Sequence, residues 1–269
     1  SVNTVTAPSA PSSVDIVASH GKSYLDLGTG LNRTFDGGTL IIPVAASPFT
    51  DSNPYTVNNV SGNTLQIDSD VTATFSGVFS GAGGLTKSGA GTLIFSAANT
   101  YTGATNISAG TLTVTGSLSN STAVTVSSGA TYNLGASDTI GSIAGAGTVA
   151  LNSYTLTAGG LNTDTTVSGV ITGTGGLTKT GTGTLTLNGV NTYSGTTAVG
   201  TGTLLVGSSS SNSTATVAGS TTVASGAILA GHGTVGATGT TLTNSGTVSP
   251  GNNSIGTLAV GGAYVQNSG

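Results

Sequence analysis

One stretch of the chain occurs twice. Residues 76–114 read SGVFSGAGGLTKSGAGTLIFSAANTYTGATNISAGTLTV, and residues 168–206 read SGVITGTGGLTKTGTGTLTLNGVNTYSGTTAVGTGTLLV. The copies align without a gap at an offset of 92 residues, and 22 of 39 positions are identical. Repetition over this length predicts an architecture of stacked units, in which each unit buries its apolar face against the next.

A shorter period lies inside each copy. The pattern Gly-Thr-apolar-x-apolar begins at Gly91 and again at Gly110, and in the second copy at Gly183 and Gly202. Alternating apolar and polar residues place the apolar side chains on one face of a strand, and the glycine permits the turn before it. We therefore expect an all-β fold, a parallel β-solenoid with coils of roughly 19–20 residues.

Composition excludes several classes of protein. The 269 residues include 45 Gly, four basic and eight acidic residues, and no Cys. One Arg and three Lys cannot form the basic patch that a nucleic-acid partner requires. No apolar run approaches the roughly 18 residues of a membrane-spanning helix, so we expect no transmembrane segment in this chain. The absence of Cys excludes disulfides and thiolate metal sites, and the composition favours an exported, processed bacterial surface protein.

The chain is predicted to have three parts. Residues 1–13 form an extended N-terminal arm or a mobile terminus. Residues 14–60 form a cap or irregular coils, because five of the six prolines lie before residue 61 and a solenoid end must protect its open strands. Residues 61–269 form the solenoid.

Two short segments carry a family resemblance. GGLTKSGAGTL at residues 83–93 and NTYTG at residues 99–103 resemble autotransporter-associated β-strand repeats, and residues 175–185 and 191–195 match in the second copy. Such repeats occur in the passenger domains of bacterial autotransporters. The resemblance implies a right-handed parallel β-helix outside a Gram-negative cell, with roles in adhesion, aggregation and biofilm formation.

Few residues are candidates for chemistry. Asp68 and Asp70 alternate, so in a strand both carboxylates would point to one side and meet a cation, but a solvated acidic pair at a turn is favoured. Asp138 and Asp164 are expected in turns, and His20 and His232 are too few for a triad. We expect no catalytic residue, no cofactor and no established metal site.

Matching positions in the two copies are expected to be structural. Lysines are predicted to keep a face or edge soluble, asparagines to stack as amide ladders at turns, and tyrosines to pack rather than bind sugars. The positions are Gly84, Leu85, Lys87, Asn99 and Tyr101 in the first copy, and Gly176, Leu177, Lys179, Asn191 and Tyr193 in the second.

The predicted function is structural and non-enzymatic. With so few charges, the rod is expected to associate with its own copies, end to end or through the arm, into surface fibres or matrix. The alternative is a monomeric autotransporter adhesin passenger that binds a host or sister-cell surface. A polysaccharide-active β-helix enzyme is the less favoured third hypothesis.

Overall fold

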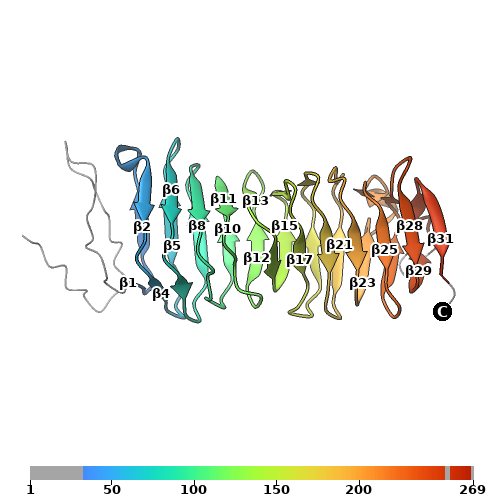
Figure 1. Ribbon diagram of the computed structural model, residues 1–269, viewed down its shortest axis with the longest axis horizontal. Helices are drawn as coiled ribbons and strands as arrows, with labels where there is room; N and C mark the ends of the chain where they lie inside the picture. Colours follow the sequence, from blue (N-terminus) through green and yellow to red (C-terminus); the bar gives the residue numbers. More distant parts are fainter. Residues whose placement is uncertain (1–32, 252–254, 268–269) are drawn as a thin grey trace, which may run out of the picture.

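The chain forms an elongated rod in which short strands lie across the long axis (Figure 1). The computed structural model describes residues 33–251 and 255–267. This part is a parallel β-solenoid with two 3-10 helices, η1 (Val44–Ala46) and η2 (Ser210–Asn212). All paired strands are parallel, which confirms the predicted all-β solenoid; the right-handed winding stays a prediction. The predicted arm, residues 1–13, lies outside the described residues.

Each coil visits three faces in a fixed order, which we call faces 1, 2 and 3. Face 1 is an 11-stranded sheet. Its strands are β2 (Thr39–Ile42), β5 (Thr64–Ile67), β8 (Leu85–Ser88), β10 (Thr105–Ile107), β12 (Ala123–Val126), β15 (Ser142–Gly145), β18 (Thr165–Val167), β21 (Thr184–Leu187), β23 (Thr203–Val206), β26 (Ile228–Gly231) and β29 (Thr247–Pro250).

The other two faces each consist of two sheets. Face 2 contains β3 (Phe49–Asp51), β6 (Thr72–Phe75), β9 (Thr92–Phe95), β11 (Thr111–Val114), β13 (Thr131–Leu134), β16 (Thr148–Ala150) and β19 (Ile171–Thr172), then β24 (Thr216–Val217), β27 (Thr234–Val235) and β30 (Ala259–Val260). Face 3 contains β1 (Arg33–Phe35), β4 (Tyr55–Val57) and β7 (Phe79–Ser80), then β14 (Asp138–Ile140), β17 (Leu156–Ala158), β20 (Leu177–Lys179), β22 (Thr197–Val199), β25 (Thr221–Val223), β28 (Thr241–Asn244) and β31 (Ala263–Gln266).

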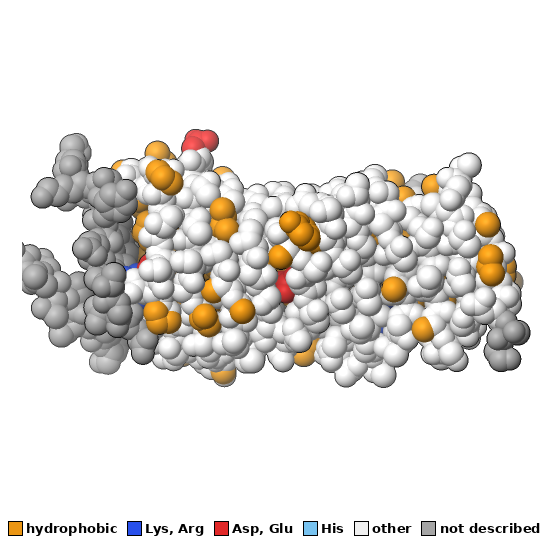
Figure 2. All heavy atoms as spheres, in the orientation of Figure 1, with side chains coloured by type: hydrophobic (Ala, Val, Ile, Leu, Met, Phe, Trp, Pro, Cys, Tyr) orange, Lys and Arg blue, Asp and Glu red, His pale blue; other side chains and the backbone are white. Residues whose placement is uncertain are grey.

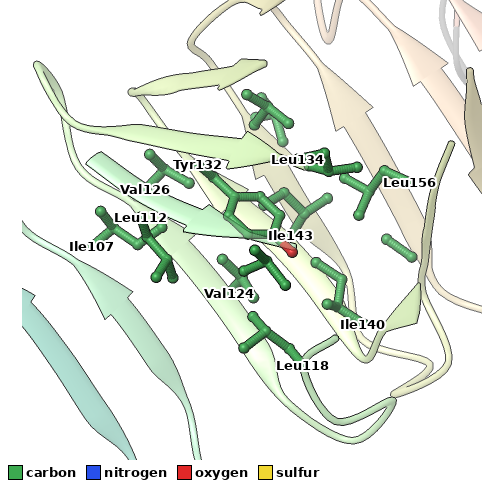
Figure 3. Close-up of a cluster of buried hydrophobic side chains, with 14 of the residues drawn as sticks. Ile107, Leu112, Leu118, Val124, Val126, Tyr132, Leu134, Ile140, Ile143 and Leu156 are labelled. Carbon is green, nitrogen blue, oxygen red and sulfur yellow. The ribbon is translucent and has the colours of Figure 1, made fainter. Parts of the chain in front are cut away.

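The core is a set of columns that run along the rod. On face 2, one column stacks Leu93, Leu112, Tyr132, Val149 and Ile171 in direct register, and each is at most 1% exposed. Figure 3 shows part of this packing, with Tyr132 among aliphatic side chains from neighbouring coils. Burying one such side chain stabilises the fold by about 1.5–3 kcal/mol, so each coil depends on its neighbours.

Coil length varies along the rod. Partners Thr105 and Val124 lie 19 residues apart, as expected from the repeat, whereas Thr203 and Ile228 lie 25 apart. The longer coil includes η2, which loops out at a corner without disturbing the strands on either side. Insertions at corners therefore change the period but leave the stack in register.

The second long copy is turned relative to the first. The Leu-Thr-Lys strand of the first copy is β8 on face 1, whereas that of the second copy is β20 on face 3. An offset of 92 residues is four coils and two of the three faces of a fifth, because the intervening coils differ in length. One motif thus forms equivalent corners that point in different directions.

The solenoid already includes residues before 61. Strands β1 to β4 pair in parallel with the strands of the next coil, so the predicted boundary at residue 61 lies inside the solenoid. The partners Thr39 and Thr64 are 25 residues apart, and η1 occupies one corner. From Arg33 onward the predicted cap region consists of longer coils.

Candidate functional site

Lys87 and Lys179 lie inside the rod, each 1% exposed, so their expected place on the surface is wrong. Lys87 shares the inward side of β8 with Leu85, and its register partners are Leu65 and Ile107. Because alternate residues of a strand share a face, the side chain must enter the core.

The buried ammonium groups tie two coils together at a corner. Lys87 Nζ donates to the carbonyl oxygens of Ser88 (2.8 Å) and Gly89 (2.7 Å) in its own coil and of Ala109 (3.1 Å) in the next. Lys179 repeats this with Thr180 (2.6 Å), Gly181 (2.8 Å) and Thr201 (3.3 Å). The motif lysine satisfies turn carbonyls that otherwise lack a donor.

We expect Lys87→Met to destabilise the protein by about 1–3 kcal/mol, because buried carbonyls would lose their donor. Denaturant unfolding measures the effect, and Thr86→Ala, a change of the outward-facing neighbour, is the control. A Met variant at least as stable as the wild type would contradict the role of the ammonium.

A pH dependence follows from the same group. Burial lowers the pKa of Lys87 to about 8, from an ordinary value of 10.5. Between these values the unfolded chain binds more protons than the folded one, so stability should rise with pH across this window. The rise should be smaller in Lys87→Met, measured by urea unfolding at several pH values; an identical pH profile in both proteins would refute it.

Asn99 and Asn191 bind main chain rather than each other, so the predicted amide ladder is wrong. Asn99 Oδ1 accepts from Phe79 N (2.8 Å) in the preceding coil, and Nδ2 donates to Ser117 O (3.3 Å) in the following one. Asn191 accepts from Ile171 N (2.8 Å) and donates to Thr216 O (2.9 Å). Since the copies lie on different faces, the two asparagines cannot stack.

The motif tyrosines are fully buried. Tyr101 and Thr105 share a hydrogen bond of 2.6 Å between their hydroxyl groups, and Tyr193 and Thr197 repeat it at the same distance. A ring with no exposed surface cannot serve as a sugar platform. Lysine, asparagine and tyrosine together fix the corners of three successive coils.

One buried hydroxyl has no partner in the described part of the chain, that of Thr221. Thr221 is the register partner of Thr197, whose hydroxyl is bonded to Tyr193. Replacing an unpaired buried hydroxyl by a methyl group removes a desolvation cost, so Thr221→Val should stabilise the protein by about 1 kcal/mol. Thr197→Val, which breaks a made hydrogen bond, should destabilise it in the same thermal scan, and equal effects would contradict the assignment.

Asp68 and Asp70 do not form a site on a strand. Strand β5 ends at Ile67, and the two carboxylates lie in the turn that follows, where Asp70 has a positive φ of 63° and is exposed. Asp68 accepts from Gln66 Nε2 (3.1 Å). Among the described residues, no group of three or more His, Cys, Asp or Glu side chains is placed to hold a metal ion.

Asp138 was expected in a turn but is buried in β14, at 4% exposure. It accepts from Tyr132 OH (2.8 Å) and from the main-chain nitrogens of Leu118 (3.2 Å) and Thr139 (2.9 Å). Burial raises the pKa of Asp138, and these hydrogen bonds oppose the rise. Alternation with Ile140 was the sequence signal that placed Asp138 inside.

The sides of the rod are almost free of charge. From residue 71 to 267 the described chain has four charged side chains, of which Lys87, Asp138 and Lys179 are buried and Asp164 is exposed. Figure 2 shows this face as mostly uncharged polar and backbone atoms. Outward threonines line up in register, as in the column Thr72, Thr92, Thr111, Thr131 and Thr148 on face 2. The surface that a partner meets is thus a regular array of hydroxyl and methyl groups.

These buried corners coincide with a known repeat family. The passenger-associated transport repeat matches residues 85–114 and 177–206, the segments that hold the lysine, asparagine and tyrosine ties. The chain carries passenger-associated transport repeats. It is a passenger-like β-solenoid, and passenger repeats imply secretion to the cell surface or beyond it.

Two curated proteins are similar to this passenger-like chain. It is 37% identical over 183 residues, 64% of its length, to the adhesin BmaC autotransporter of Brucella suis. It is 47% identical over 90 residues, 34% of its length, to an extracellular serine protease of Serratia marcescens. The chain spans 5% and 8% of the lengths of these relatives. No solved structure matches it significantly, and no helix of the described part is long and apolar enough to cross a membrane.

Proposed function

We propose that this chain is a non-catalytic segment of an autotransporter adhesin, a rod that presents uncharged polar faces to a host or sister-cell surface. The relationship to an adhesin over 64% of the chain carries the proposal. The solenoid supports it, because coil-to-coil ties at Lys87 and Asn99 hold the faces at fixed spacing. A rigid array of repeated contacts favours multivalent attachment.

The arrangement of polar side chains favours adhesion over catalysis. The buried Asp138 is enclosed by hydrogen bonds, and Asp68 and Asp70 lie together at a solvated turn. Hydrolytic chemistry on a sugar needs two opposed carboxylates across an open cleft. The similarity to a protease covers 90 residues that include a structural repeat, and it brings no activity to this chain by itself.

Surface display tests the adhesive role. A non-adherent bacterium that displays the chain on an unrelated outer-membrane anchor should attach to epithelial monolayers or to sister cells more than a strain that displays the anchor alone. Protease accessibility of the displayed chain shows that it is exposed. Exposed, folded chain without a gain in attachment would overturn the proposal, and release of peptides from casein would overturn its non-catalytic part.

A second proposal is self-association, and the nearly charge-free sides favour it. With Asp164 the one exposed charge between residues 71 and 267 of the described chain, like-charge repulsion between parallel rods is small. Sedimentation velocity over a range of concentrations should show species larger than a monomer, with little dependence on salt because few charges are screened. Monomers at the highest soluble concentration would contradict this proposal and leave the adhesive one standing.

A further inference from the structure

The chain contains a single Asn-Gly pair, Asn188–Gly189, directly after β21. Glycine is required there for packing, since a Cβ at position 189 would lie 1.9 Å from the carbonyl oxygen of Gly169 in the preceding coil. The pair is therefore fixed by the close stacking of coils. At the matching place in the first copy the residues are Ser96 and Ala97.

The side chain of Asn188 is held in a polarised state. Its Oδ1 accepts a hydrogen bond from the main-chain N–H of Ser208 in the next coil, at 2.9 Å. A donor at this oxygen stabilises negative charge that develops on it when a nucleophile attacks Cγ, as the donors of an oxyanion hole do. Asn188 is partly exposed, so water reaches the amide.

The nucleophile is the next main-chain nitrogen. No hydrogen bond joins the Gly189 N–H to another described residue, whereas Asn188 N is engaged with Val167 O at 2.9 Å. Gly189 lies at a bend between the end of β21 and the bridge at Val190, and it has no side chain to hinder approach to Cγ. The reacting nitrogen and the polarised amide thus belong to one corner of the rod.

We propose that Asn188 is a site of spontaneous deamidation in the folded protein. Gly189 N, after losing its proton to solvent base, forms a bond to Asn188 Cγ, and the Cγ–Nδ2 bond breaks to release ammonia. Water then opens the resulting five-membered imide at either carbonyl, which yields aspartate or isoaspartate. The exposed surface from residue 71 to 267 of the described chain then gains a second negative charge, beside the half-exposed Val190.

The test is to age the purified full chain at mildly alkaline pH and follow residue 188 by peptide mass spectrometry, with isoaspartyl methyltransferase labelling as a second readout. A synthetic peptide with the sequence of residues 184–193 lacks the Ser208 donor and serves as reference. We expect conversion at Asn188 in the folded chain at least as fast as in the peptide, with release of ammonia. Asn188→Ser, the residue that the first copy carries, should remove the labelling and the acidic species seen on isoelectric focusing.

Two results would overturn the proposal. One is an unchanged Asn188 in the folded chain under conditions where the peptide converts, which would show that the corner protects the amide. The other is an acidic species that persists in Asn188→Ser, which would place the modification at another amide such as Asn152 or Asn212, each followed by Ser.

Discussion

Phe79→Ala should destabilise the protein by about 3–5 kcal/mol, a cost typical of emptying a buried aromatic site. Phe79 has no exposed surface, and its ring centroid lies 4.6 Å from that of Tyr55, 4.8 Å from Phe95 and 5.5 Å from Phe75. These rings come from three neighbouring coils. All five phenylalanines of the chain lie between residues 35 and 95, so the loss should be concentrated in the N-terminal coils.

Hydrogen exchange by mass spectrometry resolves this locally, because a stack of repeats does not unfold as one unit. Protection should fall in residues 49–95 and change little beyond residue 200. Val78→Ala is the control, since Val78 is 39% exposed and its truncation should stay within about 0.5 kcal/mol. Equal loss of protection along the whole rod would contradict independent coils.

Asp51→Ala should cost about 3–5 kcal/mol, because it leaves a buried cation without its partner. Asp51 is 7% exposed and forms an ion pair with Arg33, while Asn53 N (2.9 Å) and Tyr55 OH (2.6 Å) donate to its carboxylate. The network lies in the first described coils, where β3 places Asp51 on the inward side next to Phe49. It seals charge into the first described part of the core.

The effect should depend on pH. Burial raises the pKa of Asp51, but hydrogen bonds from Tyr55 and Asn53 and the charge of Arg33 outweigh it, so the pKa lies below the ordinary value of 3.8. A lowered carboxyl pKa contributes stability above the unfolded pKa and loses it as pH falls through the folded pKa. Wild type and variant should therefore converge in acid. The exposed Asp36→Ala is the control, and a gap between wild type and Asp51→Ala that persists at the lowest pH would contradict the ionic account.

The fold was predictable from the repeats because strand alternation and a 19-residue period leave few other ways to bury Leu93 and Leu112. The period also predicted parallel pairing in register, which the pairs Thr92–Thr111 and Thr184–Thr203 confirm. The turned second copy was not predictable in this way. It depends on corner insertions whose length changes the period without leaving a strand signal.

The buried polar residues were the main error. Lys87 and Lys179 were assigned to the surface because an ammonium is expensive to bury, yet each has the same strand parity as the leucine two positions before it. Parity decided the outcome, since three carbonyl oxygens at the corner satisfy the charge. Asp138 follows the same rule. The partners that make such burial tolerable are main-chain groups of other coils, which the sequence does not display.

Paired cysteines test the central claim, that one continuous three-faced solenoid carries the two repeats on different faces. The chain has no Cys of its own, so each introduced pair reports one distance. Thr157 and Thr178 are register partners on face 3, within the span that a disulfide bridges, whereas Thr166 lies on face 1 in the strand before. Thr157→Cys with Thr178→Cys should cross-link fully under mild oxidation, and Thr166→Cys with Thr178→Cys should stay reduced. Cross-linking of the second pair and not of the first would contradict this arrangement.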